Sequence, residues 1–435
     1  MRTSAQFQVG EDFRSRLSEF AGRYEEYALL DSCGNTEYGA NTFDYLLACA
    51  AVAVIVHTEG ESVSAELKAA IHEHGDYLFG YLGYELNALQ EPVFSSPQQL
   101  FQLPAMRFFV PGILVMVKDG TATISIHEST CDTAENVFRT ISEISEENLG
   151  NFLHNPSPIT LKPLVSASDY LSTVDKIRQH IIDGDIYEMN YCQPFVANDV
   201  NINPTNLFNR LCSIAKAPFS VLYRFGEQYL ICGSPERFFS YNGETMCSMP
   251  IKGTRRRGGD AVSDKRLRDE LITSEKDRAE HVMIVDLVRN DLTPYAIPGS
   301  ITVDNLFGIY GFEQVWQMVS TIVARLRPDA HVVDALLHAF PMGSMTGAPK
   351  IRAMQLAAQY EPFQRGMYSG TFGYFTPDGH CDFNVVIRSM LYNSEQQILA
   401  AFAGGAIVYD SVAEKELEEC LLKLSAIRRV LSDLP

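Results

Sequence analysis

The sequence has little positive charge, no paired cysteine motif and no long apolar run. Its 435 residues include 35 lysines and arginines against 54 aspartates and glutamates, for a formal net charge of −19, which argues against an extended basic surface for nucleic acid. The nine cysteines show no C-x-x-C spacing, so neither a disulfide framework nor a zinc site is expected. The longest apolar run, at residues 46–56, is too short to cross a bilayer, and residues 1–6 contain no apolar signal core. These absences favour a cytoplasmic protein that has a small-molecule or protein partner and no nucleic-acid or membrane partner.

Nucleotide-binding motifs are also missing. Neither a G-x-G-x-x-G nor a Walker A sequence occurs, and helical and strand-like segments alternate irregularly rather than as βαβ units. The apolar fraction of 46% can fill a substantial core. We therefore expect an α+β fold with one or two domains. The loop-like segment 146–164, which contains three prolines, separates an expected N-terminal lobe, residues 1–150, from an expected catalytic region, residues 165–435.

Local patterns predict several elements. The apolar run 27–32 should be a strand that ends in a turn, and Pro111-Gly112 should cut short the run 108–110. Residues 113–117 and 122–126, joined through Asp119-Gly120, predict a hairpin. Further strands are expected at 220–224, 229–232, 238–241 and 245–248, which together indicate an antiparallel meander, and at 371–375, 383–391 and 398–408. Helices are expected at 204–215, 274–290, 349–360 and 413–431.

Two of the expected helices place acidic residues three apart, so that their carboxylates share one face. The pairs are Asp277 with Glu280, and Glu416 with Glu419. Because Mg²⁺ prefers oxygen ligands, often one or two carboxylates with waters and substrate oxygens, the pairs are candidate metal ligands. In so acidic a chain, solvated helix faces are the alternative.

Two loops could approach an anionic metabolite. Residues 250–259 concentrate Lys252 and three arginines between glycines, whose backbone N–H groups can close on an anion. Residues 341–350 lead into the N-terminus of an expected helix, and Gly404-Gly405 follow a strand. A solvated basic loop and ordinary connectors are the alternatives for these segments.

The order of the motifs is more informative than any one of them. Together they resemble the chorismate-utilising family, which includes anthranilate synthase component I, aminodeoxychorismate synthase component I and the isochorismate and salicylate synthases. The resemblance is strong over residues 165–430 and extends weakly to 29–32 and 80–84. It implies an anthranilate synthase component I-like fold, with large antiparallel sheets, flanking helices and an active-site cleft in the catalytic region. The matching segments are 234–238, 250–258, 279–281, 289–292, 343–350, 365–370, 387–388 and 407–411.

Two positions separate the branches of this family. In the Pro-Ile-x-Gly-Thr loop, anthranilate synthases have alanine where this chain has Lys252, as aminodeoxychorismate synthases do. Isochorismate and salicylate synthases have a water-activating lysine where this chain has Glu188. Both features favour the aminodeoxychorismate branch, which adds ammonia at C4 of chorismate. Anthranilate synthase activity and a catalytically silent chorismate-binding scaffold subunit are the alternatives.

The resemblance also implies roles for single residues. Lys252 matches a nucleophile and Glu236 a general acid near the departing C4 hydroxyl. Glu280 and Glu419 match Mg²⁺ ligands, supported by Asp277 and Glu416. The residues implied to bind substrate are Gly253, Thr254, Ser344, Tyr368, Arg388, Gly405 and Lys423. Residues 29–32 resemble a segment that lines an amino-acid site in relatives, which makes Leu30 and Ser32 candidate tryptophan contacts.

The substrates implied are chorismate and ammonia. No cysteine lies in a Gly-x-Cys-x-Gly elbow, so a separate glutamine amidotransferase subunit would supply the ammonia. The chain departs from the family pattern at Gln317, where histidine is frequent, and at Glu188, Ser344 and Ala406, where glutamine, threonine and glycine are usual. A nucleophilic lysine must be neutral, and we expect the neighbouring Arg255, Arg256 and Arg257 to lower the pKa of Lys252.

Overall fold

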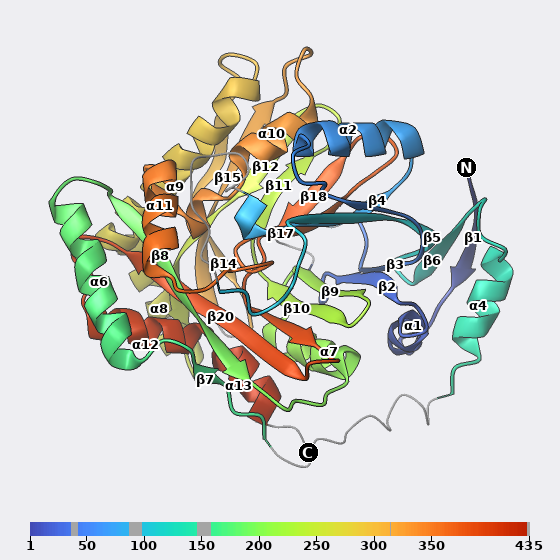
Figure 1. The fold of residues 1–435 in the computed structure, drawn as a ribbon, viewed down its shortest axis with the longest axis horizontal. Helices are drawn as coiled ribbons and strands as arrows, with labels where there is room; N and C mark the ends of the chain where they lie inside the picture. Colours follow the sequence, from blue (N-terminus) through green and yellow to red (C-terminus); the bar gives the residue numbers. More distant parts are fainter. Residues whose placement is uncertain (36–41, 87–97, 146–157, 314, 433–435) are drawn as a thin grey trace.

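The computed structural model describes residues 1–35, 42–86, 98–145, 158–313 and 315–432. All strand pairs in this part of the chain are antiparallel and belong to one hydrogen-bonded network, and helices cover its outside (Figure 1). The α+β prediction with large antiparallel sheets is therefore confirmed. None of the helices in the described ranges combines the length and hydropathy needed to cross a bilayer.

The N-terminal part contributes six strands and three helices among its described residues. Helices α1 and α4 lie at the end of the molecule away from α6 and α12 (Figure 1). The elements are β1 (Arg2–Gln8), α1 (Phe13–Ala21), β2 (Glu26–Asp31), β3 (Tyr45–Val56), α2 (Val63–His74), β4 (Leu78–Leu82), the short 3₁₀ helix η1 (Tyr84–Leu86), β5 (Met106–Lys118), β6 (Thr121–His127) and α4 (Ala134–Ser142).

The C-terminal part begins with β7 (Lys162–Pro163) and α6 (Ala167–Ile182). The elements that follow, up to the middle of this part, are β8 (Glu188–Ala197), α7 (Pro204–Ala215), β9 (Phe219–Phe225), β10 (Gln228–Ser234), β11 (Arg237–Tyr241), β12 (Thr245–Met249), β13 (Ile251–Arg256), α8 (Ala261–Thr273), α9 (Glu275–Leu292), η2 (Thr293–Tyr295), β14 (Thr302–Gly311) and β15 (Val315–Arg325). The remaining elements are α10 (Val332–Ala339), η3 (Gly343–Met345), β16 (Gly347–Ala348), α11 (Lys350–Tyr360), β17 (Thr371–Phe375), β18 (Cys381–Asn384), β19 (Ser389–Asn393), β20 (Ile398–Ile407), α12 (Ala413–Lys423) and α13 (Ser425–Ser432).

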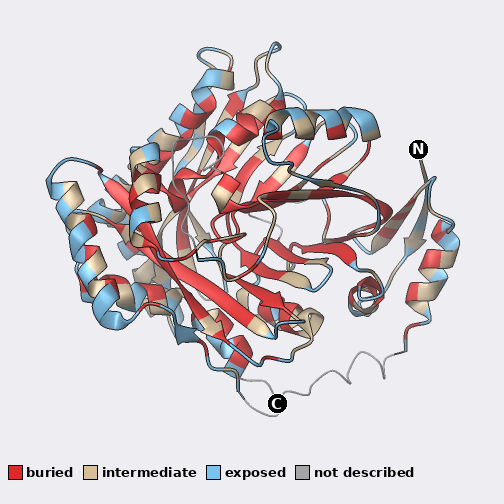
Figure 2. Ribbon diagram, viewed as in Figure 1, coloured by how far each residue is buried: buried red, intermediate tan, exposed pale blue. Residues whose placement is uncertain are grey.

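Strands of the two parts pair directly with one another. Strand β2 lies between β3 and β9, and β4 lies between β5 and β17. Apolar side chains from both parts form one core cluster, so the buried residues run through the centre of the ribbon (Figure 2). The predicted boundary near residue 150 falls partly on residues 146–157, which lie outside the described ranges. The two-part division stays a prediction.

Several predicted elements are confirmed. Helix α7 has the predicted limits, and α9 begins after Ser274, whose side chain accepts a hydrogen bond from the Asp277 N–H as the Ser-x-x-Asp pattern suggests. Strands β5 and β6 form the predicted hairpin, with Asp119 and Gly120 at positive φ in its turn. Strands β2, β17 and β20 lie where strands were expected.

Other predictions were wrong at identifiable points. Strand β5 continues through Pro111-Gly112, because Pro111 lies beside a register shift opposite residues 51–53, where a missing N–H is tolerated. The strand expected at 383–391 divides into β18 and β19, and Arg388 between them has a φ of 52°. The helix expected at 413–431 divides into α12 and α13 at Leu424.

The region around the basic loop also differs from the prediction. Most of residues 250–259 form strand β13, which pairs with β15 and shifts register between Ile251 and Thr254. Gly253 lies inside this irregularity with a φ of 84°, a conformation that suits glycine. The expected meander is two hairpins, β9–β10 and β11–β12, separated by a turn that contains Pro235 and Glu236. The register shift in β13 positions Gly253, and the turn between β10 and β11 positions Glu236, and both are predicted site residues.

Candidate active site

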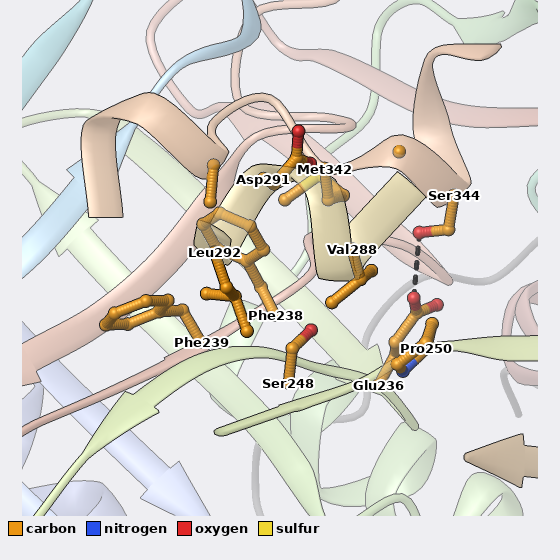
Figure 3. Close-up of a pocket in the computed structure, with 12 residues that line it drawn as sticks. Glu236, Phe238, Phe239, Ser248, Pro250, Val288, Asp291, Leu292, Met342 and Ser344 are labelled. Carbon is orange, nitrogen blue, oxygen red and sulfur yellow. Dashed lines mark hydrogen bonds between the residues drawn. The ribbon is translucent and has the colours of Figure 1, made fainter. Parts of the chain in front are cut away.

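Glu236 lies in the turn between β10 and β11, and its side chain is almost completely buried. Its N–H donates to the Ser234 hydroxyl, and its carbonyl accepts from the Val385 N–H, so the turn is held at both ends. Ser344 Oγ, from η3, donates to Glu236 Oε1 at 2.8 Å (Figure 3). Burial raises the pKa of Glu236 to about 7, although the bonds from Ser344 and the Ile251 backbone act to lower it. A carboxyl with this pKa can deliver a proton near neutral pH.

A pocket of about 350 Å³ ends at Glu236 and Ser344. Figure 3 shows both side chains at one side of the pocket, with Phe238 and Phe239 across from them. The other lining residues come mainly from β12, α9 and the segment 339–343. Glu236 and Ser344 are the only predicted site residues among those that line this pocket in the described part of the chain.

Lys252 lies on β13, and its ammonium group contacts Glu188 of β8. Lys252 Nζ donates to Glu188 Oε1 at 2.6 Å, and both side chains are largely buried. Burial by itself would lower the pKa of Lys252, but the charge and hydrogen bond of Glu188, with the more distant charges of Glu280 and Glu419, raise it above 10.5. The predicted lowering is therefore wrong for the protein without ligand.

The arginines fail to lower the pKa of Lys252 because their charges are engaged elsewhere. Arg255 pairs with Asp277 at 2.6 Å, and Arg257 pairs with Asp264 at 2.8 Å while its guanidinium lies over the Trp316 ring. The carboxylates of Asp277 and Asp264 thus offset the charges of Arg255 and Arg257.

The carboxylates of α12 lie around Gly405 of β20. A Cβ at Gly405 would come within 3.5 Å of Glu416 Oε2, 3.8 Å of Glu419 Oε1 and 3.7 Å of Lys423 Nζ. Lys423 ties α12 to β20, because its Nζ donates to the Gly404 carbonyl and pairs with Glu419, each at 2.8 Å. The absence of a side chain at Gly405 thus leaves space beside two carboxylates.

The first carboxylate pair lies on α9. Burial raises the pKa of Glu280, while Lys252 and Lys276 act to lower it. The charge of Lys423 is the main cause that lowers the pKa of Glu419, and both Glu280 and Glu419 act on Lys252. The charges of one carboxylate on α9 and one on α12 therefore act on the same lysine.

Asp277 is placed differently from Glu280. Its carboxylate is ion-paired with Arg255 and would lie 3.3 Å from a Cβ at Gly253. The structure brings Glu416 and Glu419 together and holds Asp277 against β13.

The acidic residues supply only oxygen donors, the type that Mg²⁺ prefers, and two of them, Glu416 and Glu419, lie beside Gly405. Their carboxylates are not gathered as tightly as a preformed three-ligand site. In the described ranges, the three ligand-type side chains within 4.8 Å of one another are Asp31, Cys33 and Cys212. Arg14 already pairs with Asp31 there, which disfavours a further cation.

Tyr368 and Arg388 lie close enough to interact electrostatically. The Tyr368 ring stacks on Phe402 with centroids 5.2 Å apart, and burial raises the pKa of its hydroxyl. Arg388 Nη1 donates to the Lys423 carbonyl at 2.8 Å, and burial lowers the pKa of the guanidinium. A partly buried arginine near a tyrosine can bind a substrate carboxylate.

The remaining predicted residues are more dispersed. The Thr254 side chain is exposed on β13, opposite Gln317. Leu30 lines a separate pocket between β2, β9 and β17, while Ser32 is buried and its N–H donates to the Asp44 carbonyl. Gln317 Oε1 is buried with no hydrogen-bond partner among the described residues.

Sequence reasoning missed two contacts. It named Glu188 as a departure from the family pattern and did not foresee its ion pair with Lys252. It also missed the fully buried Arg365, which pairs with Glu361 at 2.7 Å and donates to the Met345 and Asn190 carbonyls. An arginine within an otherwise glycine-rich motif was the only available signal for the second contact.

Comparisons with known proteins identify the family and the fold. Residues 27–429 match the model of a family described as chorismate binding enzyme. An aminodeoxychorismate synthase from Streptomyces griseus is 41% identical over 264 residues, which are 60% of this chain and 36% of that protein. Anthranilate synthase component 1 from Bacillus subtilis is 31% identical over 374 residues, which are 81% of this chain and 72% of that protein. The crystal structure of anthranilate synthase component I from Streptococcus pneumoniae aligns with a TM-score of 0.78 at 28% identity, covering 88% of this chain and 91% of that one. The predicted fold class is confirmed, and the chain spans about a third of the Streptomyces protein.

Proposed function

The chain belongs to the chorismate binding enzyme family, and from this premise we propose that it acts as an aminodeoxychorismate synthase component I. It would convert chorismate and ammonia to 4-amino-4-deoxychorismate, a precursor of para-aminobenzoate and folate. The observation that carries the proposal is the buried Lys252, whose charge acts on the carboxyl of Glu236. A nucleophile and a proton donor near one another fit a substitution at an allylic alcohol.

The proposed reaction has two displacements. Neutral Lys252 attacks C2 of chorismate while the C4 hydroxyl leaves as water with the proton of Glu236. Ammonia then attacks C4, and the C2–N bond to Lys252 breaks. Nitrogen thereby replaces oxygen at C4, and solvent returns the proton to Glu236.

The other site residues would bind and orient the substrate. Tyr368 and Arg388 would hold one carboxylate of chorismate, while Lys423, Gly405 and Ser344 would shape the surrounding pocket. The N–H groups of Gly253 and Thr254 are proposed to face the ligand on the side of β13.

Magnesium is proposed as the cofactor. Glu280 and Glu419 would hold Mg²⁺, with Asp277 and Glu416 beside them, and the bound ion would anchor and polarise the ring carboxylate. The oxygen-only donor set and the position of Glu416 and Glu419 beside Gly405 support this proposal.

Ammonia is proposed to come from a separate glutamine amidotransferase subunit. The sequence has no Gly-x-Cys-x-Gly elbow, and the cysteines buried in the described ranges have raised pKa values where a shift is resolved, which disfavours thiolate nucleophiles. The chain alone should use ammonium salts and not glutamine. Glutamine-dependent synthesis by the pure chain would disprove this division of labour.

The N-terminal lobe carries a separate proposal. Tryptophan would bind near Leu30 and Ser32, beside the pocket of about 320 Å³ that Leu30 lines. Calorimetry tests this directly, and the absence of a heat of binding at millimolar tryptophan would reject it.

The main test is an incubation of the protein with chorismate and Mg²⁺ in the absence of ammonia. The protein should gain the mass of chorismate less one water on the Lys252 peptide, and Lys252→Ala should remain unmodified. An unmodified wild-type protein that still makes aminodeoxychorismate would show that ammonia attacks directly.

Anthranilate synthase activity is the second candidate, because relatives of that name match the chain over a larger share of its length. Adding ammonium and identifying the product by mass separates the two, since anthranilate is fluorescent and has lost pyruvate. Magnesium-dependent consumption of chorismate would also exclude a catalytically silent scaffold.

A further inference from the structure

Glu188 has an unusual environment for a carboxylate. Its side chain is 1% exposed, Oε1 accepts the Lys252 hydrogen bond, and Oε2 has no hydrogen-bond partner among the described residues. Burial of a carboxylate oxygen without a hydrogen-bond donor lowers the stability of the fold. Such a group in a native structure is therefore a candidate for a catalytic or ligand-binding role.

We propose that Glu188 is the base that takes the proton from Lys252 and so makes it a nucleophile. This inference rests on the proposed function, because it assigns the step that precedes attack on chorismate. The glutamine that is usual at this position in the family could not have this role. An amide can accept a hydrogen bond but cannot take up a proton at neutral pH.

Geometry makes Glu188 the acceptor rather than the other acidic groups nearby. The 2.6 Å contact joins Nζ directly to a carboxylate oxygen. Glu280 and Glu419 influence Lys252 only through their charges, without a hydrogen bond in the described ranges, and the carboxyl of Glu236 bonds to Ser344 instead.

The neighbouring His281 is also a poor acceptor. Burial lowers its pKa to about 4, and its Nε2 is engaged with the Ser320 hydroxyl at 2.7 Å. Glu188 is therefore the base in contact with the amine.

The transfer also removes a chemical difficulty. An ammonium group has no lone pair with which to attack carbon, so the proton that Lys252 Nζ donates to Glu188 must leave before the C2–N bond can form. Transfer to Glu188 replaces two buried charges by two neutral groups. The neutral pair becomes more stable relative to the ion pair when a bound substrate excludes water.

The proton balance is complete. Glu188 becomes a carboxylic acid as Lys252 becomes an amine, and the amine forms the C2–N bond while the C4–O bond breaks. After ammonia attacks C4, the C2–N bond breaks and releases the neutral amine. Glu188 then returns the proton to Lys252, so the pair ends as it began.

The test follows covalent adduct formation on Lys252 by rapid quench and intact-protein mass, from pH 7 to pH 9, with chorismate and Mg²⁺. In the wild type the proton stays within the pair. In Glu188→Gln it must first be lost to water. The variant should form adduct about 10²–10⁴-fold more slowly at pH 7, and the ratio of the variant rate to the wild-type rate should rise with pH for as long as the amine of the variant is still protonated. The ratio cancels the ionisation of Glu236, which both proteins share.

Two further variants control the result. Glu188→Asp retains a carboxylate, so its profile should run parallel to that of the wild type, and it keeps the proposal testable if the glutamine variant fails to fold. Glu26→Gln breaks a largely buried pair outside the site, Arg107 with Glu26 at 2.8 Å, and should also give a parallel profile.

The outcomes separate the inference from the proposed function. A glutamine variant whose rate ratio is constant with pH would show that Glu188 only positions Lys252, and would overturn the inference while leaving the lysine adduct in place. A wild-type protein that forms no adduct would reject the lysine mechanism and this inference together.

Discussion

Replacement of Glu236 by glutamine should stabilise the protein at alkaline pH while it removes turnover. The native carboxyl has a pKa of about 7, against an ordinary value of 4.5. A group whose folded pKa is raised contributes its full stability below the unfolded pKa and loses it as the pH rises through the folded pKa. Ionisation of Glu236 above pH 7 therefore lowers the free energy of unfolding of the wild type. The glutamine variant has no such loss, because its side chain does not ionise.

The magnitude follows from the size of the pKa shift. A shift of about 2.5 units corresponds to about 3 kcal/mol at pH 8, and the same relation gives about 1 kcal/mol at pH 5. The 4% exposure of Glu236 leaves little solvent to screen this cost. The difference between the two pH values, about 2 kcal/mol, is independent of any constant effect of the amide on packing.

Urea denaturation at pH 5 and pH 8 measures this difference. The unfolding free energy of Glu236→Gln relative to wild type should increase as the pH rises. For Glu395→Gln, at an exposed turn position, the difference from wild type should be the same at both pH values. Turnover of chorismate by Glu236→Gln should be lost at both. If Glu236→Gln gives the same change in unfolding free energy at pH 5 and pH 8, the carboxylate is not buried at a cost, and its assignment as a proton donor near neutral pH loses its basis.

Four other substitutions and removal of the metal have defined expectations. Ser344→Ala removes a donor that lowers the pKa of Glu236, so the loss of kcat/KM at alkaline pH should move upward by about 1–2 pH units; an unmoved limb would mean that the hydroxyl does not stabilise the carboxylate. Glu280→Gln and Glu419→Gln should each abolish turnover without changing the circular dichroism spectrum, and EDTA should do the same to wild type until Mg²⁺ is restored; near-normal turnover in either variant would remove that residue from the metal site. Arg365→Met should lower the free energy of unfolding by about 3–5 kcal/mol, because it leaves a buried carboxylate without its partner; a midpoint equal to that of wild type in urea would contradict this.

Local signals predicted much of the fold. The Asp119-Gly120 turn and the helices α7 and α9 depend on residues near one another in the sequence, and all three lie where they were predicted. Predictions were wrong where the structure depends on contacts with a segment distant in the sequence. Pro111 ends a strand in isolation, but a register shift in β3 accommodates it within β5.

The candidate site shows the same limit. The resemblance identified Lys252 and Glu236 from their motifs, but the pKa of Lys252 was predicted from its sequence neighbours, whereas the decisive charge is 64 residues away at Glu188. Arg255 follows Lys252 closely in sequence and still turns to Asp277. Electrostatic environments depend on which side chains share a buried volume, and sequence spacing along an irregular strand does not fix that.

The pairing of β4 with β17 has a consequence for biosynthesis. Leu82 and Thr371 are register partners separated by about 290 residues, which a ribosome adding 5–20 residues per second takes roughly 15–60 s to make. During that interval β4, whose five residues are all buried in the finished protein, has an open edge on the side that β17 later covers. A nascent chain stalled before residue 371 would expose this edge, so premature termination after β4 and before residue 371 should yield aggregated or chaperone-bound fragments rather than a shortened enzyme.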